Sequence, residues 1–156
     1  MGAGKNEELR IGVISDTHGL VRPGAVKALQ GVSRILHAGD IGKPDVLETL
    51  RAIAPVTAVR GNVDGGLWAS ALPETEVVEI GGMSLYLLHN IQELDLDPAA
   101  GGFRAVIYGH SHMPAVDERN GVLFLNPGSA GPRRFRLPVS LALLRVGEAH
   151  PSIDYT

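Results

Sequence analysis

The chain has 156 residues, of which 44% are hydrophobic and 20% charged, as is ordinary for a globular protein. Its net charge of −3 argues against a nucleic-acid binder that relies on a broad basic face, although a small local nucleotide site stays open. The absence of cysteine excludes disulfides and thiolate zinc sites, which leaves oxygen and imidazole as metal ligands.

The length fits one domain, which we expect at residues 9–156, after a frayed N-terminal tail at residues 1–8. The sequence shows neither a signal-peptide pattern nor a long apolar span. We therefore expect a cytoplasmic protein without membrane contact.

Strand-like and helix-like segments alternate over the first 59 residues. Apolar runs predict strands at residues 9–15, 33–38 and 56–59, and helices are expected at residues 23–29 and 44–53, each beginning with proline. This β-α-β-α-β order implies a parallel sheet with right-handed crossovers.

The second half of the chain reads as hairpins and single strands. Gly81-Gly82 predicts a hairpin of residues 76–80 and 83–88, and Asn120-Gly121 predicts another of residues 115–119 and 122–125. Further strands are expected at residues 103–108 and 139–146, before a polar tail that contains His150. These mixed strands suggest a second sheet packed on the first.

Metal-binding side chains stand beside glycine directly after several of these strands, in the stretches ISDTHG, HAGDIG, RGNVDG and YGHSHMP. With the histidine of SLYLLHN they give seven candidate metal ligands: Asp16, His18, Asp40, Asn62, His89, His110 and His112. Each motif alone also fits a turn, a helix cap or a satisfied polar pair, and His110-Ser-His112 is the most specific of them. Ligands bind beyond the carboxyl ends of strands in such sheets, so Asp16, Asp40 and Asn62 should converge on one edge.

The chemistry of these side chains suits a pair of divalent ions. Two metals about 3.5–4 Å apart would share a hydroxide poised to attack phosphorus while they clamp the phosphate oxygens. Asp40 could bridge the two ions, because a carboxylate has two oxygens. His37 reads as a buried structural histidine, and Asp64 either as a turn former or as a residue that orients a metal ligand.

The motifs SDTHG, LHAGDI, VRGNVD, YGHSHMP and LNPGS resemble the small prokaryotic phosphodiesterase branch of the calcineurin-like metallophosphoesterase superfamily. The resemblance runs from Asp16 to about Arg133. It implies an α/β fold, a four-layer α/β/β/α sandwich with two mixed β-sheets. The same branch is related to a scaffold subunit of the eukaryotic retromer coat.

The resemblance also implies a division of the ligands between two metals. The first ion would be held by Asp16, His18, Asp40 and His112, and the second by Asp40, Asn62, His89 and His110. A hydroxide bridging the ions would attack a phosphodiester, with Asp40, Asn62 and His110 as catalytic residues. Manganese is the expected metal, with nickel, zinc, iron or magnesium as alternatives.

This chain departs from the family pattern at two positions. Val63 stands where many relatives carry a histidine that gives a proton to the leaving group, which favours diesters with good leaving groups. His89-Asn90-Ile91 stands where the branch usually has His-Gly-His, which alters the wall of the second metal site.

Arg60, Asn62 and Arg133 are candidate substrate-binding residues, since arginine and amide groups can hold a phosphate or a second ester group. Plain surface solvation of both arginines remains an alternative. We expect a small phosphodiester substrate, no extended nucleic-acid surface, and a homo-oligomer contact as an open option. The rival functions are a non-catalytic protein-binding scaffold, a phosphomonoesterase and a nuclease.

Overall fold

The structure is a computed structural model that describes residues 9–134, 136–145 and 150–155. The tail expected at residues 1–8 lies outside the described residues. Among the helices that the structure does describe, none combines the length and the apolar character needed to cross a membrane.

The first sheet has the strand order β10-β9-β1-β2-β3. Its strands are β1 (Arg10–Ile14), β2 (Arg34–His37), β3 (Val56–Ala58), β9 (Ser140–Arg145) and β10 (His150–Tyr155). The parallel β1, β2 and β3 are linked by α2 (Pro23–Ala28) and α3 (Pro44–Arg51), which confirms the predicted β-α-β-α-β unit. Proline opens both helices, where its missing N–H costs no hydrogen bond.

The end of the chain differs from the prediction of a polar tail. β9 pairs antiparallel with β1, and residues 150–155 form β10, which pairs antiparallel with β9 from His150 opposite Arg145 to Tyr155 opposite Ser140. The prediction was wrong because the pairing of a short polar strand is decided by its neighbour in the sheet and not by its own composition.

The second sheet has the order β4-β5-β6-β8-β7. Its strands are β4 (Thr75–Ile80), β5 (Met83–Leu88), β6 (Ala105–Ile107), β7 (Ala115–Arg119) and β8 (Val122–Asn126). Both predicted hairpins are present as the antiparallel pairs β4/β5 and β7/β8, and β5, β6 and β8 run parallel. Both sheets are therefore mixed, as predicted.

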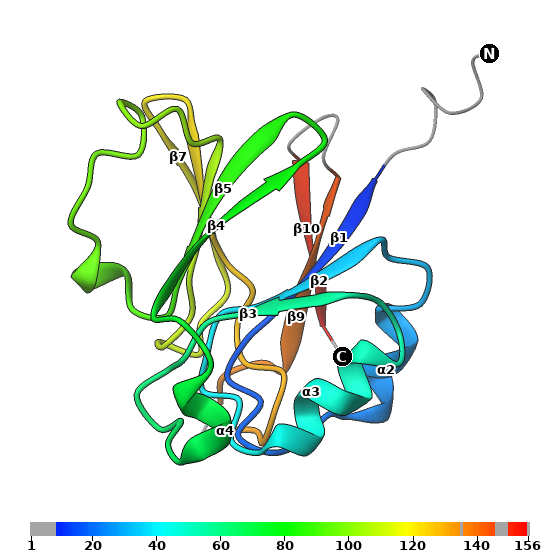
Figure 1. The fold of residues 1–156 in the computed structure, drawn as a ribbon. Helices are drawn as coiled ribbons and strands as arrows, with labels where there is room; N and C mark the ends of the chain where they lie inside the picture. The colour runs from blue at the N-terminus through cyan, green and yellow to red at the C-terminus, as the bar shows by residue number, and fades with distance from the viewer. Residues whose placement is uncertain (1–8, 135, 146–149, 156) are drawn as a thin grey trace.

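The sheets and helices form layers (Figure 1). Aliphatic side chains from both sheets, such as Leu36 and Leu87, fill the space between them, while α2 and α3 cover the other face of the first sheet. The outer face of the second sheet is covered by the 3₁₀ helix η1 (Ile91–Glu93) and the loop that follows it. The α/β sandwich predicted from the sequence is confirmed. In its fourth layer, on the outer face of the second sheet, the helix is the short η1.

Strands of both sheets end at one edge of the sandwich. The segment after β6 meets the segment after β5 through the Gly109 N–H, which donates to the His89 carbonyl at 2.9 Å. It also meets the end of β1, because the His110 N–H donates to Asp16 Oδ2 at 3.1 Å. This edge carries the predicted ligands. The short helix α4 (Leu67–Ser70) follows β3 in the chain.

Candidate metal centre

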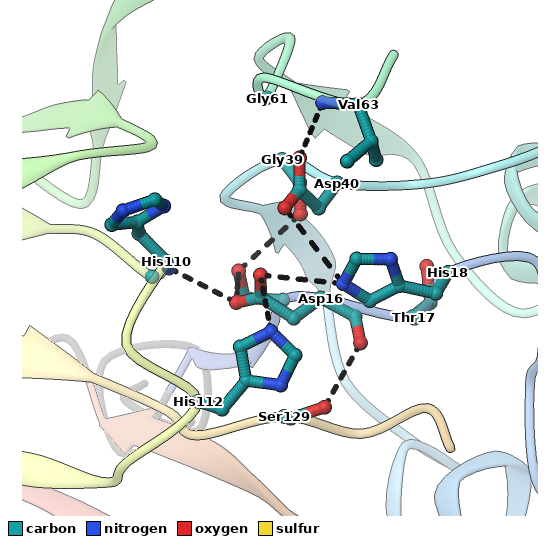
Figure 2. Close-up of polar contacts among 12 residues, drawn as sticks. Asp16, Thr17, His18, Gly39, Asp40, Gly61, Val63, His110, His112 and Ser129 are labelled. Atoms are coloured by element: carbon teal, nitrogen blue, oxygen red, sulfur yellow. Dashed lines mark hydrogen bonds and ion pairs between the residues drawn. The ribbon is translucent and has the colours of Figure 1, made fainter. Parts of the chain in front are cut away.

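The candidate ligands lie on loops that follow five different strands, with Asn62 after β3. Asp16 and His18 follow β1, Asp40 follows β2, His89 follows β5, and the His110 and His112 pair follows β6. Figure 2 shows the labelled side chains of Asp16, His18, Asp40 and His112 directed toward one another. Asp16, Asp40, His89 and His112 are buried, His18 is partly buried, and Asn62 and His110 are exposed.

The backbone at most of these ligands lies in the left-handed region. Of the six non-glycine residues with positive φ in the described chain, five are predicted ligands: Asp16 (56°), His18 (46°), Asp40 (58°), His110 (74°) and His112 (65°). Such conformations cost about 1–3 kcal/mol each and gather at functional sites, where the surrounding structure holds them. The surrounding structure therefore holds these loops in a locally unfavourable backbone conformation that positions the ligand side chains.

One group of ligand atoms is formed by Asp16, His18 and His112, whose atoms lie within 4.8 Å of one another. Asp16 Oδ1 is 3.4 Å from His112 Nε2 and 3.9 Å from His18 Nε2. Both Asp16 Oδ1 and His18 Nε2 are buried without a hydrogen-bond partner among the described residues. Buried polar atoms are normally paired, so this donor set fits a cation.

A second group of ligand atoms is formed by Asp16, Asp40 and His89, again within 4.8 Å. Asp40 Oδ2 is 3.2 Å from His89 Nε2, which is 3.3 Å from His110 Nδ1. His89 Nδ1 lies 2.8 Å from the Ala38 carbonyl, an acceptor only, so Nδ1 carries a proton. In the neutral ring this leaves the Nε2 lone pair directed at the group, as metal-binding histidines require.

Electrostatics in the centre favour a positive ligand. Burial alone would raise the pKa of Asp40, but a hydrogen bond from the protonated form of His89 and one from the Val63 N–H lower it to about 2. A bound cation would take the place of that His89 Nε2 proton. Burial raises the pKa of Asp16, and Asp40 adds to that rise through like-charge repulsion. Burial lowers the pKa of His112, and the charge of Arg134 lowers it further. Two carboxylates confined together are stabilised when a cation binds between them.

His37 is buried, as predicted, and forms hydrogen bonds with the loops that carry Asp16 and Asp40. The Gly39 N–H donates to His37 Nδ1 at 3.0 Å, so His37 Nε2 carries the proton and donates to Thr17 Oγ1 at 2.9 Å. The Thr17 hydroxyl donates in turn to the Ile41 carbonyl at 2.9 Å. Burial lowers the pKa of His37 to about 3, and protonation would break the bond from Gly39. A neutral histidine thus ties the Asp16 loop to the Asp40 loop.

Asp64 joins the loops that follow β2 and β3. Its carboxylate accepts from the N–H groups of Ile41 at 3.1 Å, Gly42 at 2.9 Å and Gly61 at 2.9 Å. Asp64 therefore has both of the roles expected for it. It supports the loop that carries Asp40, and it closes its own turn at Gly61. Gly61 approaches Asp40 so closely that a Cβ there would collide with the Asp40 backbone N and carboxylate.

Two serines also hold Asp16, one beside it in the sequence and one in the LNPGS motif. The Ser15 hydroxyl donates to Asp16 Oδ2 at 2.7 Å, and the Ser129 hydroxyl donates to the Asp16 carbonyl at 3.0 Å. Ser15 stands next to Asp16 and could have been found from the motif. Ser129 is 113 residues away, and only the fold reveals its contact.

Two of the three predicted substrate-binding residues lie at a cavity beside the candidate centre, and the third does not. Arg60 and Asn62 line a cavity of about 240 Å³ beside His89 and His110. Arg133 is exposed on the loop after Gly131 and is not among the residues lining that cavity. The neighbouring Arg134 is the arginine whose charge lowers the pKa of His112.

Residues 9–149 match the family model described as the calcineurin-like phosphoesterase superfamily domain. Among curated proteins, a probable metallophosphoesterase of Methanothermobacter thermautotrophicus is 37% identical over 87% of this chain and 85% of its own. A phosphodiesterase of Methanocaldococcus jannaschii is 30% identical over 77% of this chain and 83% of its own.

Solved structures share the fold over nearly the whole chain. An archaeal phosphodiesterase matches with a TM-score of 0.81 at 24% identity, covering 94% of this chain and 99% of its own. Vps29 of Entamoeba histolytica in complex with zinc matches with a TM-score of 0.76 at 26% identity, covering 92% of this chain and 89% of its own.

Proposed function

The chain belongs to the calcineurin-like phosphoesterase superfamily, and on that premise we propose that it is a metal-dependent phosphodiesterase with a two-metal centre. The proposal depends above all on one observation. Two groups of ligand atoms share the buried carboxylate of Asp16, and atoms of the first group have no partner among the described residues. A pair of adjacent cation sites is what phosphoryl chemistry of this kind uses.

Asp16 belongs to both groups of ligand atoms, and Asp40 also approaches an imidazole of each group. Asp40 Oδ2 lies 3.7 Å from His18 Nε2 and 3.2 Å from His89 Nε2, and these imidazoles are assigned to different ions. That position supports Asp40 as the ligand common to both. Asp16, His18, Asp40 and His112 would hold one ion, and Asp40, Asn62, His89 and His110 the other.

When bound, two divalent ions would lower the pKa of water and neutralise phosphate oxygens. The protein groups hold the substrate beside them: Asn62 and Arg60 face the adjoining cavity, where they can donate hydrogen bonds to phosphate oxygens. Val63 is 51% exposed next to Asn62, and its side chain has no proton to give. Leaving groups that depart without protonation are therefore favoured, as in activated diesters.

The finer assignments are part of the same proposal. We expect manganese as the resident ion, although oxygen and imidazole ligands suit several divalent metals. The expected substrate is a small phosphodiester, and the expected location is the cytoplasm. Leu67 is 92% exposed near Trp68 and Leu72, an apolar segment that would serve a homo-oligomer contact.

A protein-binding scaffold of the same fold is the second candidate, and the similarity to Vps29 favours it. A two-metal catalytic centre needs its full set of ligands, including a bridging carboxylate, whereas a scaffold can lose some of them. Their presence in this chain favours the enzyme.

The test uses metal-stripped protein reloaded with manganese, and bis(p-nitrophenyl) phosphate and p-nitrophenyl phosphate as substrates. We expect hydrolysis of the diester in preference to the monoester. Asp40→Asn should lower the rate by more than the roughly 10–100-fold that loss of a supporting contact costs. Asp45→Asn, an exposed change on α3, is the matched control. Failure of the folded, reloaded protein to hydrolyse either ester would favour the scaffold.

A further inference from the structure

A cavity of about 240 Å³ adjoins the candidate metal centre. Its inner wall is shared with that centre and consists of Asn62, His89 and His110. Its outer wall is formed by Arg60, Glu74, Asn90 and Glu93, to which no function has been given except at Arg60. A diester whose phosphorus lies at the centre would direct one of its two ester groups into this space.

The cation of the outer wall is already paired. Arg60 Nη2 donates to Glu74 Oε2 at 3.0 Å, and the Arg60 backbone N–H donates to the Pro73 carbonyl at 2.8 Å. The two contacts fix residue 60 against residues 73 and 74. Because Glu74 offsets the charge of Arg60, this part of the wall offers hydrogen-bond donors and acceptors without a net positive charge.

Glu93 adds a carboxylate to the outer wall, and among the described residues it forms no ion pair. Asn90, where the chain departs from the family pattern, places it there. Asn90 Oδ1 accepts from the Gln92 N–H at 3.0 Å, and the Asn90 carbonyl accepts from the Glu93 N–H at 3.0 Å. Asn90 therefore caps η1 and leads the chain from His89 to Glu93 in one turn. The formal charges of Arg60, Glu74 and Glu93 sum to −1.

On the basis of the proposed function, we propose that this cavity binds one ester group of the phosphodiester and selects a small alcohol with amino or hydroxyl donors. Carboxylates accept hydrogen bonds and attract cations, so Glu74 and Glu93 bind such groups. An ester group that itself carries a negative charge is repelled by the Glu93 carboxylate. An alkyl group binds weakly because it leaves the polar groups of the wall without hydrogen-bond partners. The selected class is the neutral or cationic polar alcohols, of which ethanolamine is the simplest amino member.

Symmetric dialkyl phosphates test this selection whichever ester group enters the cavity. Bis(2-aminoethyl), bis(2-hydroxyethyl), diethyl and bis(carboxymethyl) phosphate are compared as competitive inhibitors of bis(p-nitrophenyl) phosphate hydrolysis. Their alkoxide leaving groups need a proton donor, so they should bind without turning over. Calorimetry with the same four compounds gives the equilibrium constants independently of turnover.

We expect affinity to fall in the order aminoethyl, hydroxyethyl, ethyl, carboxymethyl. An exposed charge pair contributes little, so the aminoethyl compound should bind about two- to fivefold more tightly than the ethyl compound. Glu93→Gln should remove most of that difference, and Glu93→Lys should reverse the order of the aminoethyl and carboxymethyl compounds. Glu118→Gln on β7 changes the net charge by as much as Glu93→Gln does and should leave the order intact.

Equal affinities for the four compounds in the wild-type protein, or an order that Glu93→Lys does not change, would overturn the assignment of the cavity. That failure is distinct from failure of the proposed function. If the wild-type protein does not hydrolyse bis(p-nitrophenyl) phosphate, the proposed function is wrong, and calorimetry still decides whether the cavity selects polar alcohols.

Discussion

The hydroxyl of Thr17 supports the candidate centre without being one of its ligands. Thr17 is fully buried between Asp16 and His18, accepts from His37 and donates to the Ile41 carbonyl. These bonds connect the loop after β1 to the loop after β2. Contacts of this kind fix the orientation of metal ligands, and metal affinity depends on them.

Thr17→Val removes this hydroxyl and keeps the shape of the side chain. It leaves the His37 N–H and the Ile41 carbonyl without their partner, so we expect metal affinity to fall about 10–100-fold. Thr17→Ser keeps the hydroxyl and should restore affinity to near the wild-type value. Calorimetric titration of Mn²⁺ into the three metal-free proteins measures this, and an unchanged affinity in Thr17→Val would contradict the role of the hydroxyl.

At the scale of the elements, sequence patterns correctly predicted the helices and hairpins whose formation depends on neighbouring residues in the chain. Proline at the first turn and apolar spacing placed α2 and α3, and glycine-containing turns placed both hairpins. β10 was missed because His150 and Pro151 give no strand pattern and its ladder with β9 is a tertiary contact. The acidic side chains of the cavity were missed for a similar reason, since Glu74 and Glu93 meet only after the chain folds.

The loops after β2 and β3 depend on a close approach at Gly61. Since a Cβ at this position would collide with the Asp40 backbone and carboxylate, Gly61→Ala should displace Asp40. A displacement of about 1 Å in a catalytic site can cost about 10²-fold in rate, and we expect a loss of that order in diester hydrolysis. Gly65→Ala in the same loop is the control, because nothing lies within 4 Å of a Cβ there. Equal rates for the two variants would contradict the proposed role of this contact.

At the scale of the whole molecule, two sheets contribute to one centre. The order of motifs predicted that Asp16 and Asp40 would meet at the carboxyl edge of β1 and β2, and the structure brings them together. The sequence could not show how the second sheet delivers His89 and His110 to the same edge, because that depends on how the sheets pack. Nor could it show the contact of Ser129 with Asp16, which joins residues 113 positions apart.

The stoichiometry of metal binding tests the two-metal centre most directly. Mn²⁺ is titrated into metal-free protein while bound metal and the hydrolysis of bis(p-nitrophenyl) phosphate are measured in the same samples. We predict saturation at two ions per chain, with hydrolysis rising as the second ion binds. Metal-free protein that hydrolyses the diester as fast as the loaded protein, or protein that binds no Mn²⁺ saturably, would contradict the account.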